Sequence, residues 1–393
     1  MMYVTVLFIL LILCGVKSTK LSLLILSLSF FIYIALSFPA GNDWLGYFNN
    51  YDCLVNSLCS NSTPSFEFGY NFVVKALGWM GFQTIIIFVA LFNLYALIQF
   101  SKNFENKAFI FFAMFCFFGW VIYSEAVRQS IAISILLLGI PSLYRGDKFK
   151  SLIFIFIATL FHTTAIVLLV MLAPLYSDKM SKRMCSLIVS SAIIFASVPL
   201  MLLSFVLSLL PIGSLPYEKL YFYLVTPQYM PQFSAGIGIV FDFLLLFIVF
   251  KCLRTIKNNG LAKMQTSESV TLIGCVLFIS FSLIVGKMMP VMTRIGWYGI
   301  PFLIILISTR VTPSNYFLCF KPKPYLLFTC LVYLYLCSQS ARPFLYEHSR
   351  YGIIHQETIF TRLDELNDNG LRNAAEQKCN VLHGMGLSYL CTL

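Results

Sequence analysis

Charged residues are scarce in this chain: Asp, Glu, Lys and Arg together make up 11% of its 393 residues. Soluble domains carry roughly 25% charged residues, so the composition excludes an ordinary soluble protein. Hydrophobic residues make up 59% of the chain, and apolar runs of about 15–25 residues recur along it. The sequence therefore predicts an all-α, polytopic integral membrane protein, because only helices and closed barrels satisfy their backbone groups within lipid.

Several familiar signatures are also missing. The sequence has no HExxH motif, no Cys/His cluster and no DxD pair, so nothing in it argues for a bound metal. It lacks the glycine loop of ATP-binding proteins, and we expect no cofactor. The first apolar run has no basic leader and is followed by Lys17 and Lys20 instead of a cleavage site, so we expect no cleavable signal peptide.

The net charge of +11 would suggest a nucleic-acid partner in a soluble protein. Here Lys and Arg collect in short turns between apolar segments, as they do on the cytoplasmic side of membrane proteins, so we expect no nucleic acid. The apolar segments lie at about 3–16, 21–38, 84–100, 108–123, 128–144, 151–174, 186–210, 234–250, 269–289, 295–309 and 325–339.

The side of the membrane on which each turn lies depends on whether the segment 151–174 crosses the membrane or folds back. If every segment crosses once, the basic turns 176–185 and 251–263 fall on the outer side, against the positive-inside rule. A re-entrant hairpin that folds back near residues 161–164 removes both conflicts; the alternative is an ordinary span with another segment miscounted. We expect the hairpin and about 10 crossings, hence a membrane domain over 1–339 with outer loops at 39–83 and 212–233 and an outer tail at 340–393.

The 39–83 loop carries two candidate bases. Asp43 follows the second apolar segment, and Glu67 opens a helical stretch that runs to about residue 79. A carboxylate at the outer interface can take a proton from an acceptor hydroxyl. Each acid also has a structural interpretation: Asp43 is a favoured N-cap residue, and Glu67 in a first helical turn complements the helix dipole.

Three cations fall near the outer boundary. Arg128 opens an apolar segment beside Gln129, and its forked guanidinium suits a diphosphate, although a local pair with Glu125 explains it as well. Arg294 and Lys287 are expected at the same boundary, where they would favour an anionic lipid head group. His162 lies in the proposed break, where it either hydrogen-bonds another helix or binds phosphate and relays a proton. The 212–233 loop adds four tyrosines, which are ordinary at an interface.

Of the twelve cysteines, eight lie in or beside apolar segments, and the other four lie in the first loop and the tail. Cys53 and Cys59 are in the 39–83 loop, and Cys379 and Cys391 are in the tail. Both pairs fall on the outer side, where oxidation is allowed, so we expect two disulfides, with free thiols as the alternative.

Taken in order, these motifs resemble the EpsG/Wzy group of bacterial polysaccharide polymerases. The resemblance rests on Asp43-Trp44-Leu45-Gly46-Tyr47, on Phe66 to Tyr70, on the segment from Val127 to Ala132, on the segment around His162 and on Arg294 to Tyr298. Family members commonly have Pro where this chain has Phe68, and the resemblance ends before the tail. Within these motifs we expect Asp43, Glu67 and His162 as catalytic residues, and binding of substrate or diphosphate by Trp44, Tyr47, Tyr70, Arg128, Gln129 and Arg294. Lys287 is added to the binding residues from its expected place at the outer boundary.

The resemblance implies a Wzy-like O-antigen or capsule polymerase in the bacterial inner membrane, with its site facing the periplasm. Its substrate would be an undecaprenyl-diphosphate-linked oligosaccharide, and its architecture would be similar to metal-independent GT-C glycosyltransferases. Its partners would be the lipid bilayer and a chain-length regulator. Fold analogy alone does not establish function. The alternatives are a polysaccharide flippase or other transporter, another lipid-linked-sugar glycosyltransferase or O-antigen ligase, and a membrane acyltransferase.

Overall fold

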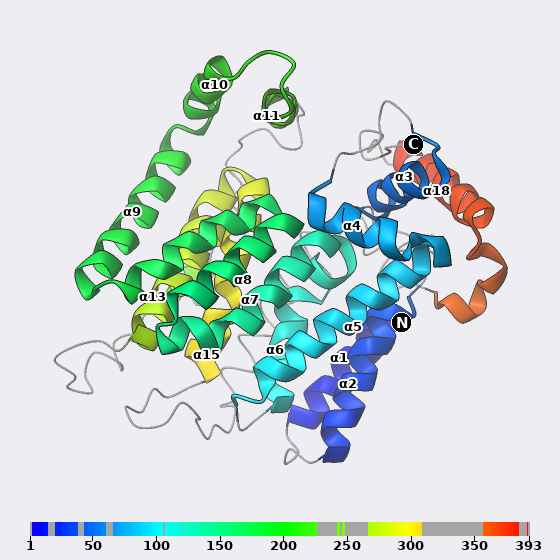
Figure 1. Cartoon of the computed structure of the whole chain (residues 1–393), viewed down its shortest axis with the longest axis horizontal. Helices are drawn as coiled ribbons and strands as arrows, with labels where there is room; N and C mark the ends of the chain where they lie inside the picture. Colours follow the sequence, from blue (N-terminus) through cyan, green and yellow to red (C-terminus); the bar gives the residue numbers. More distant parts are fainter. Residues whose placement is uncertain are drawn as a thin grey trace. The chain divides into compact units, whose positions relative to one another are not determined.

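A computed structural model describes residues 2–14, 20–37, 43–59, 66–104, 107–119, 121–225, 242–243, 246–247, 266–308, 357–384 and 391. Over these residues the chain is helical, apart from turns and an isolated antiparallel bridge between Ser37 and Thr358 (Figure 1). The predicted all-α class is therefore confirmed.

Four helices in the described ranges are long and apolar enough to cross a membrane. All internal backbone groups of such a helix bond within the segment, so it can pass through lipid. The chain is a membrane protein, while the expected 10 or so crossings and the GT-C-like architecture stay predictions. The four helices are α5 (Phe82–Ser101), α7 (Val127–Arg145), α9 (Asp178–Ser197) and Thr266–Lys287, which comprises α13, η4 and η5.

The chain divides into two compact units, the first made of Met1–Leu138, Phe156–Thr163 and Thr312–Leu393. At its centre α6 is buried along nearly its whole length, as expected of a helix that is hydrophobic on all sides. α6 contacts α1, α2 and α5. The helices of this unit are α1 (Met2–Cys14), α2 (Lys20–Ala35), α3 (Asp43–Asn56), α4 (Phe68–Leu77), η1 (Gly78–Met80), α5, α6 (Lys107–Phe118), η2 (Val121–Glu125), α7 as far as Leu138, the end of α8 (Lys148–Phe161), η8 (Ile359–Thr361), η9 (Leu363–Glu365) and α18 (Asp368–Gly384).

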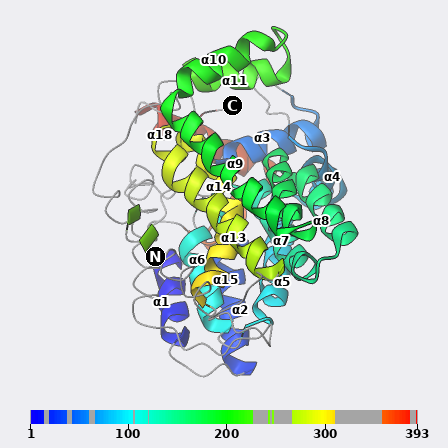
Figure 2. The ribbon, with the colours of Figure 1, turned by 90° about the vertical axis from the view of Figure 1, so that its left-hand side faces the viewer.

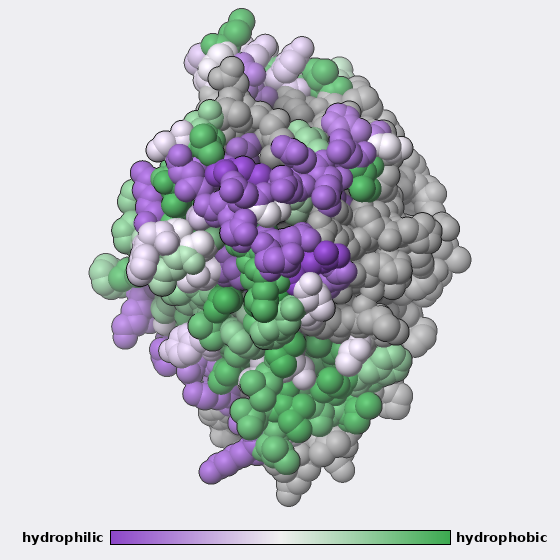
Figure 3. All heavy atoms as spheres, turned by 90° about the vertical axis from the view of Figure 1, so that its right-hand side faces the viewer, coloured by the Kyte–Doolittle hydropathy of each residue, from purple (hydrophilic) through white to green (hydrophobic). Residues whose placement is uncertain are grey.

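One face of the first unit separates into two zones (Figure 3). Hydrophilic residues gather over its upper part, at the height where Figure 1 shows α3 and α18, and hydrophobic residues cover the lower part, at the height of α1 and α2. The exposed side chains of α1, α2 and α5 include Phe8, Ile12, Leu24, Leu28, Phe88 and Leu91. An apolar belt below a polar cap is the surface expected where a helix bundle leaves lipid for water.

The second unit consists of Gly139–Ile155 and Thr164–Val311. α13 is its central helix: it contacts α9 and α15, and Figure 2 shows α9 and α13 side by side. Gly274 of α13 permits this packing, because a Cβ there would lie 2.4 Å from the Phe302 ring of α15. Its remaining elements are η3 (Thr163–Leu175), α10 (Pro199–Leu209), α11 (Leu215–Val225), α13 (Thr266–Phe278), η4 (Ile279–Ile284), η5 (Val285–Lys287), η6 (Pro290–Met292), α14 (Thr293–Gly296), η7 (Trp297–Gly299) and α15 (Ile300–Ser308).

The structure interrupts two of the predicted segments. The expected interruption at 161–164 is present, because α8 ends at Phe161 and η3 begins at Thr163; that the two limbs fold back as a hairpin stays a prediction. The apolar segment at 186–210 is divided between two helices. α9 ends at Ser197 and α10 starts at Pro199, since proline cannot donate the backbone hydrogen bond that a continuous helix needs. The predicted segment 325–339 lies outside the described residues.

Candidate active site

Glu67 and Arg128 form an ion pair in the first unit. Glu67 is the N-cap residue of α4, but its side chain makes no capping hydrogen bond to that helix. Its Oε2 instead accepts a hydrogen bond from Nη1 of Arg128, at the start of α7. The side chains of Glu67 and Arg128 are 12% and 17% exposed, so the pair is largely withdrawn from solvent. Glu125, the local partner that the sequence allowed for Arg128, accepts from the backbone N–H of Asp43 at 3.0 Å.

Aromatic rings surround the Arg128 guanidinium. Its Cζ lies 3.9 Å from the centroid of the Phe66 ring and 5.8 Å from that of Tyr47, within range of cation–π attraction. The Tyr47 hydroxyl also faces the backbone N–H of Arg128 at 3.4 Å. Tyr70 packs on both rings, with centroids 5.4 Å from Tyr47 and 5.6 Å from Phe66. The three aromatic residues of these two motifs thus hold one guanidinium in place.

Two buried polar atoms beside this cluster have no hydrogen-bond partner among the described residues. They are Nε of Arg128 and the hydroxyl of Tyr70. A buried donor without a partner costs about 1–3 kcal/mol, so such atoms are commonly explained by a ligand or water that completes them. The guanidinium therefore retains a donor beyond the one that Glu67 uses.

The Glu67 carboxylate also contacts Thr163, the residue that follows the helix interruption at His162. Oε1 of Glu67 accepts from the backbone N–H of Thr163 at 3.3 Å and faces its hydroxyl at 3.4 Å. It therefore supplies an acceptor for the first amide of η3, which the preceding helix leaves without one. His162 is buried at this point, and its backbone N–H donates to the backbone oxygen of Ala158 in α8.

The electrostatics of Glu67 follow from these neighbours. Burial by itself raises the pKa of Glu67, but the charges of Arg128 and His162 and the hydrogen bond from Thr163 outweigh it and lower that pKa overall. The Glu67 carboxylate is therefore ionised at neutral pH. An ionised carboxylate held by a cation is a weak base until that cation is engaged elsewhere.

The motif around Glu67 requires a glycine at position 69 because two helices approach each other closely there. A Cβ at Gly69 would lie 2.8 Å from the backbone oxygen of Leu160, in the last turn of α8. The absence of a side chain lets α4 approach the end of α8, which brings Glu67 to Thr163. The glycine thus serves close approach.

A buried polar cluster supports the first turns of α7. Ser130 accepts a hydrogen bond from Nδ2 of Asn93 at 2.9 Å, and the Ser134 hydroxyl donates to Oδ1 of Asn93 at 2.8 Å. All three side chains are fully buried, as is the neighbouring Gln129. Hydrogen bonds of this kind join membrane helices, here α5 to α7, and fix the part of α7 that carries Arg128. Sequence reasoning passed over this cluster because its residues are uncharged and widely spaced.

The remaining predicted residues lie as follows. Asp43 and Trp44 begin α3, and the Trp44 side chain is buried. Arg294 and Lys287 belong to the second unit: Arg294 is half-buried in α14, and Lys287 forms an ion pair of 2.5 Å with Asp242. The participation of these two cations in one site with Arg128 stays a prediction.

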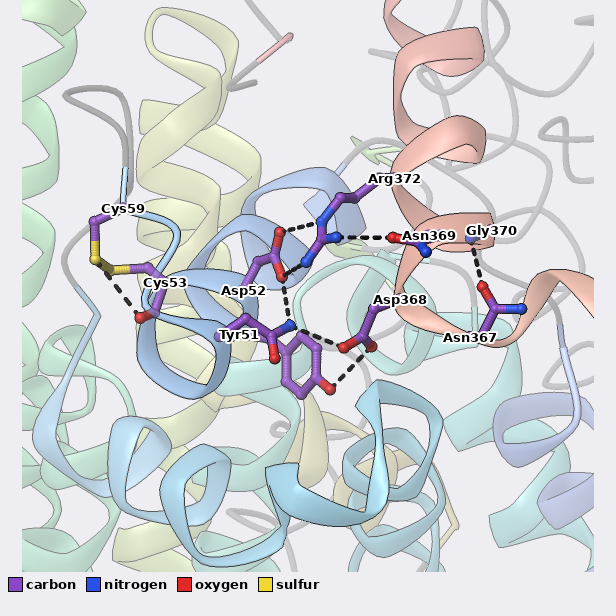
Figure 4. Close-up of polar contacts among 10 residues, drawn as sticks. Tyr51, Asp52, Cys53, Cys59, Asn367, Asp368, Asn369, Gly370 and Arg372 are labelled. Carbon is purple, nitrogen blue, oxygen red and sulfur yellow. Dashed lines mark hydrogen bonds and ion pairs between the residues drawn. A yellow bond between two sulfur atoms is a disulfide. The ribbon is translucent and has the colours of Figure 1, made fainter.

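The four cysteines of the 39–83 loop and the tail are joined in two disulfides. Cys53 and Cys59 close the loop disulfide, and Cys379 and Cys391 close the tail disulfide, with Cα atoms 4.3 and 5.3 Å apart. Figure 4 shows the loop disulfide at the end of α3. Over the described ranges, no three His, Cys, Asp or Glu side chains group as metal ligands would.

The arrangement of Glu67, Arg128 and the aromatic residues occurs in a chain that a known family accounts for over most of its length. The model of the EpsG family matches residues 20–349. The chain belongs to the EpsG family. Membership indicates a membrane protein with the glycosyltransferase-like activity of a glycan polymerase. The match contains every predicted catalytic residue and ends before α18. The comparisons with curated proteins and with solved structures give no match.

Proposed function

We propose that this EpsG-family protein polymerises a bacterial polysaccharide such as O-antigen or capsule. It transfers the growing glycan from an undecaprenyl-diphosphate carrier onto the next lipid-linked repeat unit, without a metal ion, at the periplasmic face of the inner membrane. The observation that carries the proposal is the Glu67–Arg128 pair beside the helix interruption at His162. Its carboxylate would serve as the base, and its guanidinium would bind the diphosphate.

The proposed reaction has simple requirements. The acceptor hydroxyl oxygen attacks the anomeric carbon of the donor glycan, and the bond from that carbon to the carrier diphosphate breaks. The hydroxyl proton passes to a carboxylate, and the diphosphate leaves with the bonding electrons. Arg128 stabilises the charge on the departing diphosphate, because a preorganised cation acts most strongly where charge develops.

The ion pair suggests how the base becomes active. A diphosphate is a bidentate partner for a guanidinium, and on binding it would compete with Glu67 for Arg128. Once Arg128 engages the diphosphate, the pKa of Glu67 rises, because the charge that lowers it is shared. Glu67 is then the base, with Asp43 and His162 as the other candidates. Glu67 would thus become a stronger base only when the donor is bound, and this limits proton transfer in the absence of the donor.

The experiment is deletion of the gene in its host, followed by a gel of the surface polysaccharide. We expect a single repeat unit on the lipid core, restored to a ladder by the parent gene and not by Glu67→Gln or Arg128→Lys. A product with no repeat unit at all would instead indicate a flippase or a ligase and would refute the polymerase.

A further inference from the structure

The tail after the family match makes specific contacts with α3. Arg372 of α18 holds the Asp52 carboxylate through two hydrogen bonds, from Nε at 2.7 Å and from Nη2 at 2.6 Å. Asp368 accepts from the Tyr51 hydroxyl at 3.1 Å and from Nδ2 of Asn56 at 2.8 Å. Figure 4 shows Asp52 and Tyr51 of α3 facing Arg372 and Asp368 of α18. They join positions more than 300 residues apart in the sequence.

The ion pair between Arg372 and Asp52 is partly buried and well aligned. The Asp52 side chain is 11% exposed and that of Arg372 is 32% exposed, and their geometry is the bidentate fork of Arg with a carboxylate. Removal of one partner from such a pair leaves a charge without compensation. A second attachment lies at the end of α2, where the Ile359 N–H donates to the Leu36 oxygen at 3.0 Å. The tail thus holds the chain on either side of the start of α3.

α3 connects these contacts to the candidate site. Tyr47 and Tyr51 are four residues apart and so lie on one face of the helix. Tyr47 contacts the Arg128 guanidinium, and Tyr51 contacts Asp368 of the tail. A displacement of α3 at Tyr51 therefore moves Tyr47, and with it the aromatic surroundings of Arg128.

We propose, on the basis of the polymerase function above, that α18 is a strap that positions α3 for the transfer reaction, with Arg372 and Asp368 as positioning residues. The strap acts through Tyr47 on the guanidinium that receives the diphosphate. Small displacements matter here, because a misplacement of about 1 Å costs on the order of 100-fold in rate.

The test compares two tail arginines in the full-length protein. Arg372→Ala removes the ion pair between α18 and Asp52 of α3 and leaves the Asp368 contacts in place. Arg362→Ala is the matched control, because Arg362 is 34% exposed and pairs with Glu357 and Glu365, both within the tail. Hydrogen–deuterium exchange reports the mobility of α3. The polymerisation rate is measured on lipid-linked repeat units isolated from the deletion host.

For Arg372→Ala we expect exchange across α3 to rise about 10-fold. We also expect kcat to fall about 10-fold, with KM within about twofold of the parent. Arg372→Lys keeps one charge contact, so its α3 exchange and its kcat should lie between those of the parent and Arg372→Ala. The same comparison can be made with Arg372→Lys if Arg372→Ala does not accumulate. Arg362→Ala should match the parent.

Two results would overturn the strap: unchanged exchange in α3 of Arg372→Ala, or increased exchange with parental kcat while Arg128→Lys is inactive. If Arg128→Lys and Glu67→Gln both polymerise normally, the proposed site has failed. The exchange in α3 would still decide whether α18 positions that helix.

Discussion

The Glu67–Arg128 pair could stabilise the fold, take part in the transfer reaction, or do both. The sharpest test of the candidate site separates these two roles. Arg128→Ala leaves the Glu67 carboxylate in a position that is 12% exposed. Loss of one partner from a buried pair costs about 3–5 kcal/mol, and the residual exposure places the expected cost near 3 kcal/mol. That corresponds to a fall of about 4 °C in apparent melting temperature for a chain of this length. The variant should also make only single-repeat product.

The double variant Glu67→Gln, Arg128→Gln separates the two roles. It removes both charges together, so no uncompensated charge remains, and most of the lost stability should return. Polymer should not return, because neither a base nor a diphosphate-binding cation is present. Arg128→Lys keeps the charge but loses the fork, and we expect its activity to be nearly as low as that of Arg128→Ala.

The assays are thermal unfolding of the purified protein in detergent and a gel of surface polysaccharide from the complemented deletion host. A double variant that restores a long ladder would contradict a chemical role for the pair, which would then serve only to stabilise the fold. An Arg128→Ala variant that melts with the parent would show that the pair is not buried in the working protein.

Four further predictions follow from other parts of the structure. Asp43→Asn and Asp43→Ser keep the capping ability of that residue, so a loss of long polymer in both at normal protein levels would identify Asp43 as the base, and full activity would exclude it. Gly69→Ala places a Cβ 2.8 Å from the Leu160 oxygen; by separating α4 from α8 it should destabilise the protein by about 1–3 kcal/mol, and unchanged melting would contradict this contact. Hydrogen bonds and the charge of Arg372 outweigh burial and lower the pKa of Asp52, so the strap should hold from pH 7 to about 4 and loosen only below that; α3 exchange that rises already at pH 6 would be inconsistent. Reduction of the loop and tail disulfides should cost about 2–3 kcal/mol each for loops of this length, measured by melting with and without reductant.

Part of the candidate site was predictable because its signals are local. Asp43 and Glu67 stand out as acids in a polar loop between apolar segments, and Arg128 as a cation at the start of another. The interruption at His162 was also predictable, from the distribution of basic turns along the chain.

The partners of these residues were not predictable. The sequence allowed Glu125 as a partner for Arg128, because residues three apart on a helix are neighbours. The structure pairs Arg128 with Glu67, 61 residues away. Thr163 escaped notice because a threonine beside apolar residues has no distinguishing pattern until a carboxylate faces its amide.

Composition alone determined the class of this protein, since a chain so poor in charge and so rich in apolar runs has only helices with which to cross a membrane. Tertiary structure decided which faces of the helices pack against one another. α6 is apolar on every side, so its sequence carries no sign of the direction in which it packs. The Glu67–Arg128 pair and the strap of α18 on α3 join distant segments, and such pairings arise from close packing of whole helices, which no local pattern of residues records.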